Sequence, residues 1–94
     1  MKVYEVWYES GIDYEGNGAG ILASYMNRKS AEEHLAWIEK KLREDIQLYD
    51  RGTIDEYVPG DHIYGDGFGG DYDRWYIVER DILDEFAPTA LTLY

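Results

Sequence analysis

The sequence contains no cysteine, only two prolines and only two histidines among its 94 residues. Without cysteine the chain can form neither a disulfide framework nor a thiolate metal site, which favours an intracellular location. No stretch approaches the roughly 18 apolar residues of a membrane span, and the opening MKVYEVWYES lacks the apolar core of a secretory signal. We therefore expect a cytoplasmic protein.

Basic residues are also scarce. Nine lysines and arginines stand against twenty acidic residues, so the formal net charge is −11. Such an excess disfavours non-specific contact with nucleic acid or with an anionic membrane, and we expect neither as a direct partner. Hydrophobic residues nevertheless make up 45% of the chain, which is typical of a folded protein. The length predicts a single domain over residues 1–94.

The N-terminal third predicts an antiparallel hairpin from residue 2 to about residue 26. Residues 2–9, KVYEVWYE, alternate as strands do, with Tyr4, Val6 and Tyr8 toward the core and Trp7 among glutamates on a partly covered face. Asn17 and Gly18 form a typical turn dipeptide before the second apolar run, GILASYM.

An amphipathic helix follows. Ser30 and Glu33 have the spacing of a capping box, and Gly52 is a natural stop. One apolar stripe recurs at steps of three and four residues: Ala31, Leu35, Ile38, Leu42, Ile46 and Tyr49. We expect His34, on the flank of this stripe, to be a solvated surface residue. Trp37 lies away from the stripe, so either the following loop covers it or it forms an exposed contact patch.

The last third begins with a long acidic loop from Asp50 to Asp73, within which residues 53–58, TIDEYV, suggest a short strand or hairpin arm. Residues 74–83, RWYIVERDIL, alternate as a strand, and residues 89–94 suggest a C-terminal edge strand. The order strand, strand, helix, loop, strand predicts an α+β fold, in which a small antiparallel sheet packs on one helix.

Catalytic and metal-binding chemistry find little support. The two histidines, His34 and His62, are isolated from any nucleophile motif, so we expect a protein that is not an enzyme. Asp61, Asp66 and Asp71 recur every five residues beside glycines, but this is not the ligand spacing of an EF-hand. We therefore predict no catalytic residue, no cofactor and no metal, and a small metal- or ligand-binding domain remains an alternative.

The acidic loop favours protein binding. Residues 50–73 contain seven carboxylates and one arginine, and tyrosines are interleaved with them. Carboxylates can take the place of phosphates by charge-assisted pairing with arginine and lysine, and aromatic side chains supply contact area at low entropic cost. The predicted partner-binding residues are Asp55, Glu56, Tyr57, Asp61, Tyr64, Asp66, Phe68, Asp71, Tyr72 and Asp73, with Trp37 on the helix.

A capped helix between a hairpin beginning MKVYEVWYE and a strand ending WYIVERDIL, in a very acidic cysteine-free chain, resembles the small proteins encoded by phages and prophages. The anti-CRISPR and anti-restriction inhibitors among them often act as DNA mimics. The resemblance implies an inhibitor in the cytosol of a host cell, which occupies the basic nucleic-acid-binding groove of a host protein such as a CRISPR effector or restriction nuclease. A phage accessory protein that self-associates through an edge strand or Trp37 is a further alternative, and a homodimer is left open.

Overall fold

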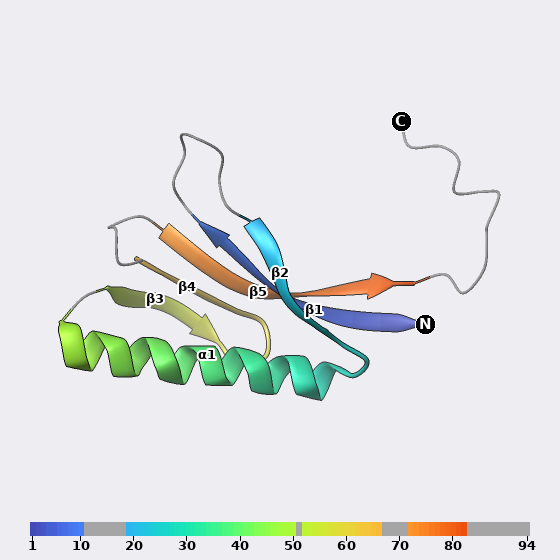
Figure 1. The fold of residues 1–94 in the computed structure, drawn as a ribbon, viewed down its shortest axis with the longest axis horizontal. Coiled ribbons are helices and arrows are strands. Elements are labelled where there is room, and N and C mark those ends of the chain that lie inside the picture. Colours follow the sequence, from blue (N-terminus) through green and yellow to red (C-terminus); the bar gives the residue numbers. More distant parts are fainter. Residues whose placement is uncertain (11–18, 51, 67–71, 83–94) are drawn as a thin grey trace.

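The computed structural model describes residues 1–10, 19–50, 52–66 and 72–82. In chain order the elements are β1 (Lys2–Ser10), β2 (Ala19–Tyr25), α1 (Arg28–Tyr49), β3 (Thr53–Val58), β4 (His62–Asp66) and β5 (Tyr72–Asp81). The strands form one antiparallel sheet in the order β2-β1-β5-β4-β3, and α1 lies along one face of it (Figure 1). The predicted α+β fold, with an antiparallel sheet packed on one helix, is confirmed.

The sheet joins two hairpins through its longest strand pair. β1 and β2 form the predicted N-terminal hairpin, and β3 and β4 form a second one. β5 lies between the two hairpins and pairs with β1 from Lys2↔Asp81 to Ser10↔Asp73. The two strands at the outer edges of the sheet are therefore β2 and β3.

The core lies between α1 and the facing side of the sheet. Its buried members are Val6, Ala31, Leu35, Ile38 and Ile63. The helical residues belong to the predicted apolar stripe, and the strand residues come from β1 and β4 at alternate positions. Partly buried apolar side chains surround them: Tyr4, Tyr25, Leu42, Ile54, Tyr57, Trp75 and Ile77.

The structure corrects the predicted ends of the helix. α1 begins at Arg28, and its N-cap is Asn27, whose side-chain oxygen accepts a hydrogen bond from the backbone N–H of Ser30 at 2.8 Å. The capping box predicted at Ser30 and Glu33 is therefore wrong, because Ser30 already lies in the first turn. At the other end the C-cap is Asp50, with a φ of 51°, and not Gly52.

Residues 53–66, most of the span predicted as a loop, form the β3–β4 hairpin. The predicted arm at residues 53–58 coincides with β3. Gly60 has a φ of 78°, the left-handed conformation that glycine adopts without strain, and the N–H of Asp61 donates to the carbonyl of Val58 at 3.0 Å to close the turn. The edge strand predicted at residues 89–94 lies outside the described residues.

The face of the sheet opposite α1 is called the open face here, because no described helix or strand lies over it. Alternation along the strands brings to this face Glu5, Trp7 and Glu9 of β1, Arg74, Tyr76 and Arg80 of β5, His62 and Tyr64 of β4, and Glu56 of β3. It is therefore rich in aromatic and charged side chains.

Candidate functional site

The negative charge of the chain is concentrated outside the helix. α1 carries five basic and five acidic residues, so the whole net charge of −11 belongs to the rest of the sequence. The β3–β4 hairpin, residues 53–66, contains Asp55, Glu56, Asp61 and Asp66 and no lysine or arginine. We refer to it as the acidic hairpin.

A β-bulge in β3 places two of these carboxylates on one face. Ile54 pairs with Gly65 and Glu56 with Tyr64, so Asp55 is the extra residue between two regular pairs. A bulge of this kind interrupts the alternation of side chains. Asp55 and Glu56 consequently both reach the open face, where they line one pocket.

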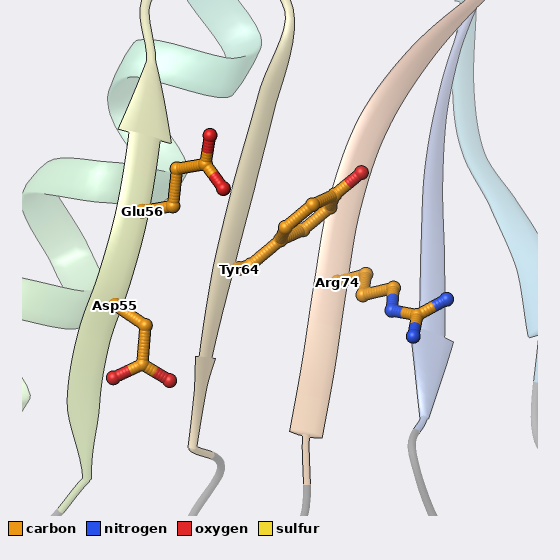
Figure 2. A pocket seen from close by; sticks show the side chains of 4 residues that line it. All are labelled: Asp55, Glu56, Tyr64 and Arg74. Atoms are coloured by element: carbon orange, nitrogen blue, oxygen red, sulfur yellow. The ribbon is translucent and has the colours of Figure 1, made fainter.

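This pocket spans three neighbouring strands. It has a volume of about 350 Å³ and is lined by Asp55 and Glu56 of β3, Tyr64 of β4 and Arg74 of β5 (Figure 2). The guanidinium carbon of Arg74 lies 5.7 Å from the centroid of the Tyr64 ring, within the range of a cation–π contact. The pocket therefore combines two carboxylates, an aromatic face and one cation.

His62 connects the turn of the acidic hairpin to β3. Its Nδ1 lies 2.7 Å from Oδ2 of Asp61, and its Nε2 lies 3.3 Å from Oε1 of Glu56. Burial alone would lower the pKa of His62, but the carboxylates of Asp61 and Glu56 outweigh burial and raise the pKa above its ordinary value. The protonated imidazole is thus the form that this environment favours.

The side chains of the two carboxylates still reach solvent. Glu56 is 57% exposed and Asp61 is 59% exposed, so each can contact a partner while it faces His62. The histidine itself is mostly enclosed, because its ring stacks on Tyr64 with centroids 4.2 Å apart. The acidic hairpin therefore presents both carboxylates to solvent beside an enclosed imidazole.

A second group of polar and aromatic residues continues across the open face. Oε1 of Glu5 accepts hydrogen bonds from Nε1 of Trp7 at 3.0 Å and from Nε of Arg80 at 2.9 Å. These two hydrogen bonds lower the pKa of the buried Glu5 carboxyl. The ring of Trp7 lies parallel to that of Tyr76, at an interplanar angle of 6°.

The hydroxyl of Tyr76 ties this group to Glu9, donating to its Oε2 at 3.2 Å. Burial, together with the neighbouring Glu9, raises the pKa of the Tyr76 hydroxyl. Alternation in the sequence places Trp7 among glutamates on the partly covered face of the first strand, as the structure shows. Sequence reasoning gave these open-face residues of β1 and β5 no part in a site, because the pairing of β1 with β5 that brings them together is not visible in either strand alone.

The structure brings only some of the predicted site residues together. Asp55, Glu56, Asp61 and Tyr64 belong to the acidic hairpin and lie on or beside the open face. Tyr57 instead packs against the core under α1, and Asp73 accepts a hydrogen bond from the hydroxyl of Tyr8 at 3.0 Å. Tyr57 and Asp73 are therefore separated from the carboxylates of Asp55, Glu56 and Asp61.

The remaining predicted residues of the loop lie at or beyond the ends of β4 and β5. Asp66 and Tyr72 are paired in register, but their side chains lie outside the described part of the structure. Phe68 and Asp71 lie outside the described residues altogether.

Trp37 is exposed. The alternative in which the acidic loop covers Trp37 is wrong for residues 53–66, because these form the β3–β4 hairpin of the sheet. Its side chain is 56% exposed, and Nζ of Lys41 lies 5.6 Å from its ring centroid. His34 is not the solvated residue that was predicted: it is half-buried, and its Nδ1 lies 3.0 Å from the hydroxyl of Tyr25. The histidine packs there because position 34 of α1 lies over the end of β2.

Two general features of the described residues bear on chemistry. No three of their histidine, aspartate or glutamate side chains form a group that could hold a metal ion. No helix that they form has the length and apolar character needed to cross a lipid bilayer.

Comparison of the chain with protein-family models, with curated proteins and with solved structures finds no match.

Proposed function

We propose that the protein is a binding inhibitor that presents its acidic hairpin to the basic nucleic-acid-binding groove of a host defence or nucleic-acid-processing protein. The observation that carries this proposal is the arrangement of Asp55, Glu56 and Asp61 on one hairpin that has no lysine or arginine of its own. The target class, a CRISPR effector or restriction nuclease, follows the resemblance to phage-encoded inhibitors.

The chemistry of the hairpin suits a partner rich in arginine and lysine. Carboxylates pair with guanidinium groups through charge-assisted hydrogen bonds, as phosphates do. A charged surface also accelerates encounter with a partner of opposite sign. The exposed carboxylates of Glu56 and Asp61 supply the charge, and the bulge at Asp55 supplies a third carboxylate on the same side.

Aromatic contact area lies next to these charges. Tyr64 forms one wall of the pocket, and its ring is held between His62 and Arg74. A side chain that is already fixed loses little conformational freedom on binding. A partner arginine can therefore pair with Asp55 and Glu56 while its apolar stem contacts Tyr64.

The test begins with recovery of a target. The tagged chain is incubated with bacterial lysate and eluted with increasing salt, and the eluted proteins are identified by mass spectrometry. Exposed charge pairs weaken as the Debye length falls from about 10 Å at 0.1 M to about 3 Å at 1 M salt. A nuclease or polymerase that elutes with salt supports the proposal and names the target.

Matched variants then decide which surface binds. The triple variant Asp55→Asn, Glu56→Gln, Asp61→Asn removes three charges from the acidic hairpin, whereas Glu33→Gln, Glu44→Gln, Asp45→Asn removes three from α1. We expect the hairpin variant to lose its ability to displace DNA from the purified target and the helix variant to keep it. An equal loss of DNA displacement in both variants would mean that the effect depends on net charge and not on the hairpin. Full activity of the hairpin variant would refute the proposal.

A further inference from the structure

The two outer strands of the sheet differ in charge. β3 carries Asp55 and Glu56, whereas β2, at the other edge, has no charged residue from Ala19 to Tyr25. Residues 16–27, which contain β2, are the longest stretch of the sequence without lysine, arginine, aspartate or glutamate. Charged side chains on an outer strand are a common protection against pairing with another chain, and β2 lacks them.

β2 also exposes large apolar side chains. Ile21 is 49% exposed and Leu22 is 50% exposed. Val6 pairs with Ala23 and Trp7 with Ile21, so Leu22 is the extra residue of a bulge. No described residue pairs with β2 on the side away from β1, so within the described part of the chain no strand takes up its outward backbone groups.

On the opposite face of the sheet, the flank of α1 next to β2 carries a further group of aromatic side chains. The ring of Tyr25, at the end of β2, contacts His34, and the ring of His34 lies 6.3 Å from that of Trp37. Trp37 therefore lies on the β2 side of the helix, while the opposite flank faces the acidic hairpin through the hydrogen bond from Arg28 to the carbonyl of Gly60. The exposed Met26 lies between β2 and α1 in the chain.

We propose that a second copy of this chain pairs with the outer edge of β2, forming a two-fold symmetric dimer with one continuous antiparallel sheet. Two copies that each carry a charge of −11 repel one another wherever their acidic surfaces meet, and β2 is the edge at which no like charges oppose. A strand paired antiparallel with its own copy is self-complementary, as a two-fold interface requires.

The same charges explain why assembly stops at two chains. Pairing through β2 uses both uncharged edges and leaves the two β3 strands as the outer strands of the dimer. Each of these carries Asp55 and Glu56, so further edge-to-edge pairing brings like charges together. The acidic hairpins remain free at opposite ends, and the inference does not depend on what they bind.

Sedimentation equilibrium on the full chain tests the dimer over a wide range of protein concentration, at low and at high salt. We expect a species of twice the chain mass of 11.0 kDa whose population increases with salt, because screening removes the repulsion between copies. This salt dependence is the reverse of that expected for binding of the acidic hairpin to a basic partner. A monomer under all these conditions overturns the inference.

Two sets of variants locate the interface. Leu22→Glu adds a charge to the edge of β2 and should abolish the dimer, whereas Val58→Glu places the same charge on an exposed apolar position of β3 and should not. Circular dichroism of both variants checks that they fold. Loss of the dimer in the Val58 variant, or its survival in a folded Leu22 variant, overturns the inference.

Because the sequence contains no cysteine, disulfide trapping gives an independent measurement. Single cysteines are placed at the exposed β2 positions Ala19, Ile21, Leu22 and Ser24, and control cysteines at Thr53 and Val58 of β3. Under mild oxidation at least one β2 cysteine should give a covalent dimer in much higher yield than either control. Equal yields from both strands contradict pairing through β2.

Discussion

The imidazole of His62 is stacked on the ring of Tyr64, with centroids 4.2 Å apart and an interplanar angle of 23°. The two residues are alternate positions of β4 and so share the open face. This stacking holds the histidine where its two ring nitrogens face Asp61 and Glu56. The titration of one side chain is thereby coupled to the charge of the acidic hairpin.

His62 should make stability depend on pH near neutrality. Its pKa in the folded protein is raised above the ordinary value of 6.5 by Asp61 and Glu56, against the opposing effect of burial. A raised folded pKa contributes stability that is complete below the unfolded pKa and is lost as pH rises through the folded pKa. The free energy of unfolding should therefore fall as the pH rises through the folded pKa of His62. The substitution His62→Gln should remove the part of this fall that His62 contributes.

Urea denaturation of wild type and His62→Gln at a series of pH values measures this effect. His34→Gln is the matched control, because the ring of His34 contacts the hydroxyl and ring of Tyr25 and the ring of Trp37, whereas His62 faces two carboxylates. A constant difference in unfolding free energy between wild type and His62→Gln at every pH contradicts the prediction.

Gly65→Ala should destabilise the acidic hairpin. A methyl group at Gly65 of β4 would collide with the carbonyl oxygen of Thr53 in β3, so the backbone of one strand must move. Overpacking of this kind costs about 1–3 kcal/mol. Gly20→Ala in β2 is the control, since nothing lies within 4 Å of its added methyl group. Chemical denaturation of the two variants should show a loss only for Gly65→Ala, and similar losses in both would refute this explanation.

Asn27→Ala should lower the free energy of unfolding by about 1 kcal/mol, the usual cost of removing an N-cap. The reason is the hydrogen bond that its side chain accepts from the N–H of Ser30. Ser30→Ala keeps that N–H and should cost much less. The opposite order, measured by thermal or urea denaturation, would place the cap at Ser30.

The Asn27 cap illustrates what the sequence could and could not predict. Periodicity predicted the N-terminal hairpin, α1 and β5, because long alternating and helical patterns depend on which side chains reach the core. The exact start of α1 was predicted wrongly because Asn27 and Ser30 are both good caps, and only the path of the preceding strand decides between them. Ala31, Leu35 and Ile38 of the predicted stripe are buried, as expected.

The acidic hairpin was the larger omission. Its glycines and aspartates suggested a loop, and they concealed β4, although Pro59 and Gly60 form a typical turn dipeptide between two short apolar segments. Grouping of Asp55 with Glu56 depends on a bulge, and the position of Arg74 depends on pairing between β4 and β5. Neither is a property of local sequence, so the pocket could not be predicted.

Glu5 should contribute to stability in the neutral range and lose that contribution in acid. Hydrogen bonds from Trp7 and from Arg80 lower its pKa below the ordinary value of 4.5. A lowered folded pKa gives stability that is present above the unfolded pKa and lost as pH falls through the folded pKa. The difference in unfolding free energy between wild type and Glu5→Gln should therefore be largest near pH 7 and shrink below 4.5.

Glu79→Gln is the matched control for Glu5, because Glu79 is an exposed sheet residue whose Oε2 lies 3.5 Å from Nζ of Lys2. Exposed pairs of this kind contribute little to stability. Urea denaturation of both variants at neutral and acid pH should show a larger loss for Glu5→Gln at neutral pH and a smaller gap between the two variants in acid. A Glu5→Gln protein that matches wild type at neutral pH would mean that Trp7 and Arg80 gain as much from water as they do from this carboxylate.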